Sequence, residues 1–241
     1  MQSSLYVGLS AQIAARRQLD SIANNVANAN TTGFRAEEIR FEQLISSTGD
    51  RNVSFASTGD TYIQRRSGSM VKSDNPLDVA ISGDGWLALQ TPNGTIYTRD
   101  GRMTMAENGL LQSVNGYSIL DAGNAPIRLN PADGPVSISR DGMITQNGIQ
   151  VGALGLFSIE QGAKLTRTDN SGVIPDRPAV PIIDFRSHSF MQGFTENSNV
   201  NPVMEMSRLV MVQRSFEEMT NTMESSETSF TDAIKTLGSG V

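Results

Sequence analysis

The sequence contains no cysteine and only one histidine among its 241 residues. Without cysteine there can be no disulfide bond, no thiolate metal ligand and no cysteine nucleophile. His188 has no second histidine with which to share a metal, so we expect a surface or locally bonded side chain. The aspartates mostly flank glycine, asparagine or proline, as in turns, and none has the spacing of a calcium-binding loop. The sequence therefore predicts no catalytic residue, no metal site and no cofactor.

Basic charge and long apolar runs are also scarce. The formal net charge is −6, and no cluster of lysine and arginine offers a phosphate-binding stripe, which argues against a nucleic-acid partner. No run of about 18 apolar residues occurs, so we expect no membrane insertion. Arg16 and Arg17 interrupt the first apolar stretch, so the chain is expected to lack a cleavable secretory signal.

The longest regular pattern lies in the tail, from Asn201 to Leu237. Apolar residues recur there at intervals of seven, and a second row follows three residues later, interrupted only at Ser226. This pattern predicts a coiled-coil seam instead of the broader apolar face of a globular helix. Asn201 suits the N-cap and Pro202 the first helical position. The predicted seam residues of the tail are Leu209, Val212, Phe216, Met219, Met223, Phe230 and Leu237.

The spacing of apolar residues predicts a second long helix over residues 4–29, with many alanines between the larger apolar residues. A single helix cannot bury its own seam, so we expect this helix to pair with the tail. The predicted seam residues on this side are Leu5, Leu19, Ile22 and Val26. The alternative is an ordinary amphipathic helix that covers the central part of the chain.

Residues 76–195 have a different character, because short apolar runs alternate with dipeptides that favour tight hairpin turns. We expect an all-β domain of about ten short strands, with Trp86 as a core residue. The fold class is then α+β, with paired terminal helices as a coiled-coil-like inner domain. The expected division places 1–75 and 196–241 in the helical domain with its connecting segment, and 76–195 in a β-rich outer domain. The turn dipeptides are Asn93-Gly94, Asp100-Gly101, Asn108-Gly109, Asn115-Gly116, Asp133-Gly134, Asp141-Gly142 and Asn147-Gly148.

A cluster of asparagines at the end of the first helix leads to a resemblance. The segment from Leu19 to Phe34 resembles the N-terminal signature of bacterial flagellar rod and hook proteins. Residues 196–206 and 213–217 resemble the C-terminal signature of that family, and Gly83–Leu87 and Tyr97–Gly101 resemble its middle region. The residues that carry the N-terminal motif are Asn24, Asn25, Asn28, Asn30, Thr32, Gly33 and Phe34.

The resemblance implies a structural subunit of the flagellar basal-body rod, most similar to a proximal rod subunit, that transmits torque and is not an enzyme. Implied partners are the other proximal and distal rod proteins, further copies of the chain, and the flagellar export apparatus. The implied location is the periplasm-spanning rod, reached without a cleavable signal. Phe41 and Ile45, four residues apart in an expected helical turn, are similar to the family's export signal, although a local apolar contact explains the same spacing.

Three other functions remain open, and an enzyme that would use His188 or the turn aspartates is the third and weakest. The first is a distal rod protein of the same family, which would use the same helices in the same way. The second is a binding or adhesion module in which a β domain stands on a coiled-coil stalk. A stable trimer of the isolated chain would favour this second alternative.

Overall fold

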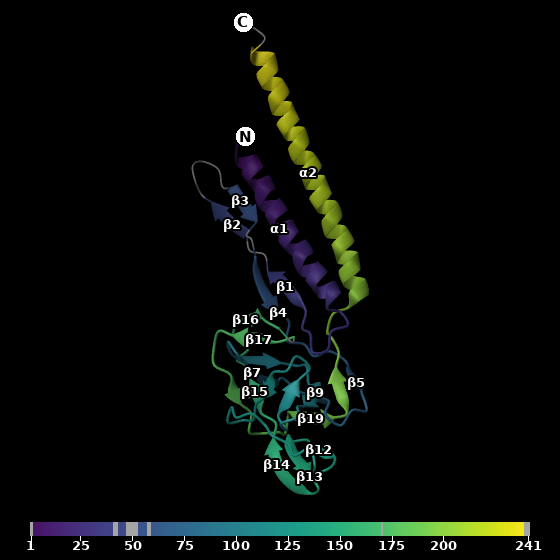
Figure 1. Cartoon of the computed structure of the whole chain (residues 1–241). Coiled ribbons are helices and arrows are strands. Elements are labelled where there is room, and N and C mark those ends of the chain that lie inside the picture. Colours follow the sequence, from purple (N-terminus) through teal and green to yellow (C-terminus); the bar gives the residue numbers. More distant parts are fainter. Residues whose placement is uncertain (1, 41–42, 47–52, 57–58, 170, 239–241) are drawn as a thin grey trace. The chain divides into compact units, whose positions relative to one another are not determined.

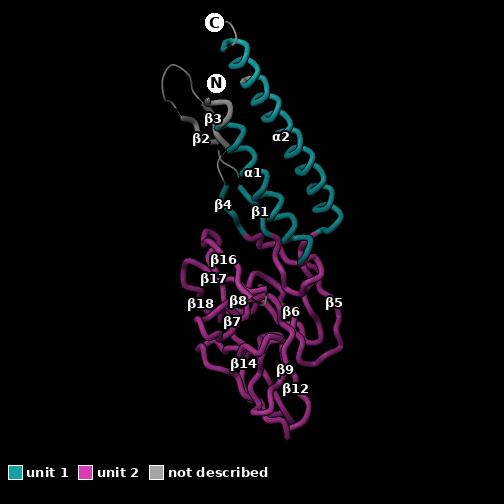
Figure 2. Tube along the Cα trace, turned by 45° about the horizontal axis from the view of Figure 1, so that its top comes forward, with its two compact units in different colours: residues 1–27, 37–62, 201–241 teal, residues 28–36, 63–200 magenta. Residues whose placement is uncertain are grey.

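The computed structural model has one helix near each end of the chain and many strands between them (Figure 1). It describes residues 2–40, 43–46, 53–56, 59–169 and 171–238. The chain divides into two compact units (Figure 2). The helical unit comprises residues 1–27, 37–62 and 201–241, and the β unit comprises residues 28–36 and 63–200. The predicted α+β class, with terminal helices and a strand-rich centre, is confirmed.

Two long helices form most of the helical unit. Helix α1 spans Gln2–Ala27 and helix α2 spans Pro202–Gly238. They lie side by side and run antiparallel (Figure 1), because Gln12 pairs with Thr220 and Asn25 with Glu205. The N-cap prediction is confirmed, since the backbone N–H of Met204 donates to Oδ1 of Asn201 over 3.2 Å. With 37 residues against 26, α2 is longer than α1 by about 16 Å at 1.5 Å per residue.

Two pairs of short strands accompany the helices. Strand β1 (Glu37–Arg40) pairs with β4 (Asp60–Ile63), and β2 (Gln43–Ser46) pairs with β3 (Val53–Ala56). The described residues of this connecting segment therefore form strand pairs.

The β unit is built around a nine-stranded sheet. The strands lie in the order β16-β17-β8-β7-β11-β10-β9, with β15 joined to β7 and β18 joined to β15. Its strands are β7 (Trp86–Thr91), β8 (Gly94–Thr98), β9 (Met103–Met105), β10 (Leu111–Ser113), β11 (Ser118–Ile119), β15 (Leu156–Ser158), β16 (Leu165–Arg167), β17 (Val173–Pro175) and β18 (Val180–Pro181).

Smaller sheets complete the β unit. Strands β12 (Val136–Ile138), β13 (Met143–Gln146) and β14 (Ile149–Ala153) form an antiparallel sheet in sequence order. Two strands from the end of the unit pair with two from its beginning: β19 (Ser189–Gln192) with β6 (Val79–Ser82), and β20 (Phe194–Glu196) with β5 (Met70–Lys72).

Buried aliphatic side chains from these strands form the core of the β unit. Val79, Ile81, Leu87 and Leu89 are fully buried in one cluster, together with Phe190 of the late strand β19. Trp86 is 3% exposed and belongs to a second cluster, so its predicted role as a core residue is confirmed.

The structure corrects two local predictions in this unit. The segment Ile127–Leu129 is a strand candidate in the sequence, because it lies between two of the turn dipeptides. It is not a strand in the structure, where Arg128 forms only an isolated bridge with Leu110. Asp100-Gly101 is not a hairpin turn, although the glycines of the other six dipeptides have positive φ. Glycine is needed at position 101 for a different reason, because a Cβ there would lie 1.8 Å from the carbonyl oxygen of Val79.

Candidate assembly site

The predicted seam of α2 lies on the face that contacts α1. Its described members Leu209, Val212, Phe216, Met219 and Met223 are half-buried, while most residues between them are exposed. Contact is close at this face, since a Cβ added at Gly8 of α1 would lie 3.1 Å from Sδ of Met223. The described seam residues are therefore less exposed than most of their neighbours on α2, and their role in a coiled-coil seam stays a prediction.

The α1 side of the contact is made largely of small residues. Ala14 and Ala15 are buried, and small side chains let the two helix backbones approach closely. Of the predicted α1 seam, Ile22 is buried, at 4% exposed, while Leu19 and Val26 are half-buried. The side chains of Leu5 and Phe230 lie outside the described part of the structure.

The seam continues on α2 beyond the contacts with α1. Ile234 is 71% exposed and Leu237 is 80% exposed. Leu237, a predicted seam residue, is therefore uncovered within the single chain. The exposed side chains of Ile234 and Leu237 are available for contact with another subunit.

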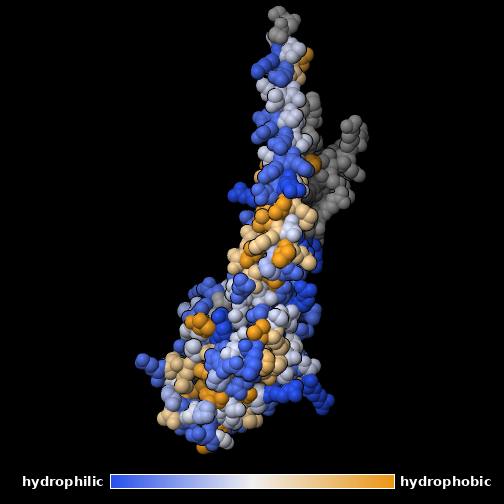
Figure 3. Space-filling view, turned by 90° about the vertical axis from the view of Figure 1, so that its right-hand side faces the viewer, coloured by the Kyte–Doolittle hydropathy of each residue, from blue (hydrophilic) through white to orange (hydrophobic). Residues whose placement is uncertain are grey.

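A second apolar surface lies on the first half of α2, away from the seam. Val203, Met206 and Val210, at spacings of three and four, are 73%, 55% and 47% exposed. Figure 3 shows hydrophobic residues gathered toward the start of α2 and mostly hydrophilic residues toward its end. From residue 217 to residue 238 the helix has five carboxylates and one lysine, so its two halves differ in both polarity and charge.

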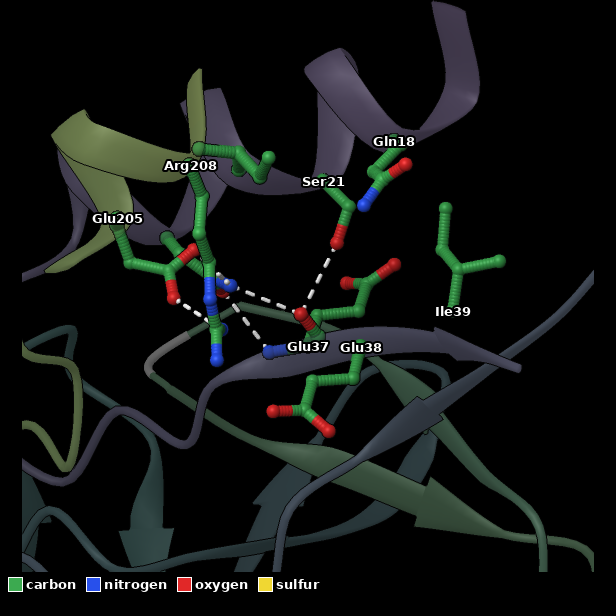
Figure 4. A pocket seen from close by; sticks show the side chains of 9 residues that line it. Gln18, Ser21, Glu37, Glu38, Ile39, Glu205 and Arg208 are labelled. Atoms are coloured by element: carbon green, nitrogen blue, oxygen red, sulfur yellow. Dashed lines mark hydrogen bonds and ion pairs between the residues drawn. The ribbon is translucent and has the colours of Figure 1, made fainter. Parts of the chain in front are cut away.

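A polar pocket of about 330 Å³ lies between α1, β1 and α2 within the helical unit (Figure 4). Asn25 is 2% exposed at its wall, where its amide donates to the carbonyl of Glu37 over 2.8 Å and its Oδ1 accepts from the Glu37 N–H over 2.8 Å. Ser21 donates to the same carbonyl over 3.0 Å. Glu205 is buried beside Asn25 and accepts from Arg208 over 2.8 Å. The motif residue Asn25 thus holds β1 against the end of α1.

The N-terminal motif is divided between the two units. Asn24 and Asn25 lie in the last turns of α1, whereas residues 28–36 belong to the β unit. Phe34 is 2% exposed, with the guanidinium of Arg167 4.1 Å from its ring centre. The carbonyl of Thr32 accepts from Ser171 over 2.9 Å. Asn30 is exposed and Asn28 half-buried, so the motif residues do not form a single surface.

Gly33 explains why the motif needs glycine, and its replacement by alanine is expected to destabilise the β unit. Its φ is +69°, and a Cβ there would lie 2.3 Å from the backbone nitrogen of Asp100. We expect Gly33→Ala to lower the free energy of unfolding by about 2 kcal/mol or more, because both the backbone conformation and the clash oppose it. Urea unfolding followed by the fluorescence of Trp86 measures the change.

Gly162→Ala is the matched control for this variant, since a Cβ at Gly162 would meet nothing closer than 3.8 Å. Its unfolding midpoint should stay near that of the wild type. Equal midpoints for the two variants would contradict the role given to Gly33.

Three charged residues meet in the interior of the β unit and form the Arg–Glu–Arg cluster: Arg35, Arg99 and Glu196. Their side chains are at most 2% exposed. Nη2 of Arg35 lies 2.7 Å from one carboxylate oxygen of Glu196, and Nε and Nη2 of Arg99 each lie 2.8 Å from the other. The carboxylate also accepts from the N–H of Gly68 over 2.9 Å.

Arg99 also joins the cluster to the glycine-rich segment before β7. It donates to the carbonyls of Ile81 and Gly83 over 2.9 and 2.8 Å, and to that of Gly85. The stretches 83–87 and 97–101, which resemble one family, therefore meet at one guanidinium.

Burial has the largest effect on the pKa values of the two arginines in the cluster. Burial lowers the pKa of Arg35 to about 10, with the positive charge of Arg99 acting in the same direction and Glu196 opposing both. The pKa of Arg99 is also lowered by burial, and Glu196 again opposes the shift. Both guanidiniums remain charged at neutral pH, so Glu196 faces two cations in a poorly solvated site.

The sequence pattern did not single out these three residues as a site. Arg99 and Glu196 lie within stretches that carry the family resemblance, and Arg35 directly follows such a stretch. This position was the signal available in the sequence. Burial could not be deduced from it, because arginine and glutamate usually lie at the surface.

The two residues of the candidate export signal are only partly described. Phe41 lies outside the described residues. Ile45 lies in β2, where it is paired with Ser54 of β3, so the predicted helical turn is wrong at Ile45. The neighbouring strand supplies its backbone partners in place of a helical turn.

Within the described residues, no group of three histidine, aspartate or glutamate side chains is placed to hold a metal ion. In that same part of the chain, neither helix combines the length and apolarity that a membrane span requires.

Comparison with protein families matches three parts of the chain. Residues 5–35 match the model described as "Flagella basal body rod protein", and residues 191–236 match "Flagellar basal body rod FlgEFG protein C-terminal". Residues 80–146 match "Flagellar hook protein FlgE/F/G D1 domain". The matched ends include α1 and most of α2, and the central match includes the middle of the β unit.

Full-length relatives agree with these matches. The chain is 52% identical over 239 residues to "Flagellar basal-body rod protein FlgF" of Mesorhizobium japonicum, with 99% of each chain covered. It is 44% identical to the protein of the same name in Rhizobium meliloti and 37% identical to that of Caulobacter vibrioides, again over 99% of each chain.

Proposed function

The chain belongs to the family of flagellar basal-body rod proteins, and we propose that it is the FlgF-type subunit of the proximal rod. It is a structural protein and not an enzyme, and the family implies assembly with other rod and hook components. The exposure of two apolar side chains, Ile234 and Leu237, near the otherwise hydrophilic end of α2 is the observation that carries the proposal of assembly through the helices.

The proposed assembly uses the helices as a coiled-coil-like inner domain. In this proposal residues 1–75 and 196–241 contain the axial core with its connecting segment, and residues 76–195 form the outer domain. Within the first range, residues 28–36, 63–75 and 196–200 pack with the β unit. Support comes from the half-buried row Leu209, Val212, Phe216, Met219 and Met223 on the α1-facing side of α2. Contacts between unlike surfaces of successive subunits generate a helical tube when they do not close into a ring. Apolar surfaces buried between subunits resist sliding, as a torque-transmitting shaft requires.

The other proposed partner is the flagellar export apparatus, which the chain would contact in transit. The support is the family membership and the candidate signal at Phe41 and Ile45. After export, the chain would reside in the periplasm-spanning rod.

Quantitative mass spectrometry of purified hook-basal bodies tests the proposal. A handful of copies per structure is expected for a proximal rod subunit. Several-fold more copies would favour the distal rod protein, and absence from the purified structures would contradict the rod role. In the last case a trimer of the isolated chain would indicate the stalked binding or adhesion module.

A further inference from the structure

We propose that Glu196 acts as a latch for the β unit. The unit does not reach its closed, native packing until residues 189–200 have joined it. The Arg–Glu–Arg cluster, the late strands β19 and β20, and Asn199 carry this inference. It concerns the order of folding, and only its consequence for export depends on the proposed rod function.

The late strands complete parts of the β unit that begin more than a hundred residues earlier. Val79, Ala80 and Ile81 of β6 are fully buried, and β6 pairs with β19. Phe190 of β19 is 1% exposed and belongs to the same core cluster as Val79 and Ile81. Without β19, this early strand loses its paired neighbour and the core loses a buried aromatic ring.

Native packing of the β unit depends more strongly on Glu196 than on an ordinary late strand, and the reason is electrostatic. Arg35 and Arg99 are buried around a carboxylate that lies 97 residues beyond Arg99 in the sequence. A compact β unit without Glu196 would hold two buried guanidiniums and no carboxylate between them. Such a state is strongly disfavoured, so the early segments cannot close in their native form.

The same late segment also satisfies the backbone of the early segments. The carbonyl of Glu196 accepts from the N–H of Gly33 over 2.7 Å. Asn199 accepts from the N–H of Ala36 over 2.6 Å and donates to the carbonyl of Arg66 over 2.8 Å. These bonds hold residues 33–36 and 66–68 close together. Their partners, Glu196 and Asn199, come later in the sequence than either of these segments.

If the chain is exported as the proposed function requires, this order of folding affects the state of the β unit during secretion. A chain exported from its amino end would leave its β unit open until Glu196 emerged, when only 45 of its 241 residues remain. The emerged part of the β unit would therefore lack its native packing for most of the passage.

Pulse-labelling hydrogen exchange during refolding of the wild-type chain tests the order directly. The amides of Leu87 and Leu89 in β7, far in sequence from the latch, should gain protection in the same kinetic phase as residues 189–192. Protection of β7 in an earlier phase would overturn the proposal.

Glu196→Gln in the full chain provides a second test. Native-state exchange of the β7 amides should become faster by roughly 100-fold or more, because two buried cations lose their anion. Glu160→Gln is the control, since Glu160 forms an exposed ion pair with Arg177. A faster exchange confined to Gly68, with β7 unchanged, would show that Glu196 acts only locally and would overturn the latch.

These outcomes are separate from those of the rod test. A chain missing from basal bodies but showing the expected exchange pattern would contradict the rod role alone. A chain present in basal bodies whose β7 is protected before residues 189–192 would contradict the latch alone.

Discussion

Arg99→Ala is expected to lower the free energy of unfolding of the β unit by about 3–5 kcal/mol, because it breaks a buried ion pair. The variant leaves Glu196 with Arg35 as its remaining cation in the cluster. It also removes a donor from the buried carbonyls before β7, at Ile81, Gly83 and Gly85. Urea unfolding followed by Trp86 measures the change, since this is the only tryptophan and it is buried next to the affected segment.

Arg177→Ala is the matched control for Arg99→Ala. Arg177 also pairs with a glutamate, but both side chains are more than half exposed. Solvent screens such a pair, so its removal should leave the unfolding midpoint almost unchanged. Similar shifts for the two variants would contradict the special importance of the buried cluster.

Phe216→Asp is expected to abolish swimming while the chain is still exported. Phe216 is half-buried in the middle of the seam of α2, and a carboxylate there would lose solvent without gaining a partner. Spreading of cells in soft agar reports motility, and immunoblots of the exported fraction report secretion. Asn221→Asp introduces the same charge at an exposed position of the same helix and should preserve swimming.

Two outcomes would contradict the role given to the seam. Normal swimming of the Phe216→Asp strain would show that the row of apolar residues is not needed for assembly. Loss of export in the same strain would mean that the defect arises before assembly.

Local patterns were sufficient for much of the fold. Heptad spacing and the cap at Asn201 located α2, because both signals lie within one segment. The strand Trp86–Thr91 also follows from the local sequence, because its apolar residues come shortly before the turn dipeptide Asn93-Gly94. Strands β19 and β20 were missed, since their partners lie far away in sequence.

The candidate sites divide in the same way. Periodicity predicts one apolar row on α2, but the exposure of Leu237 depends on how far α1 extends along α2. The cluster of Arg35, Arg99 and Glu196 depends on three distant segments coming together, which no local spacing reveals. Whether the seam and the N-terminal motif act in assembly stays a prediction that the variants above can test.

The division of the chain has a practical consequence for dissecting the protein. The chain passes between the helical unit and the β unit after residues 27, 36, 62 and 200. Neither unit is therefore a contiguous fragment, and no single protease cut or truncation can release one of them intact. A minimal β unit would have to be made by splicing residues 28–36 to 63–200, because deletions from either end remove residues of the helical unit first and leave residues 37–62 in place.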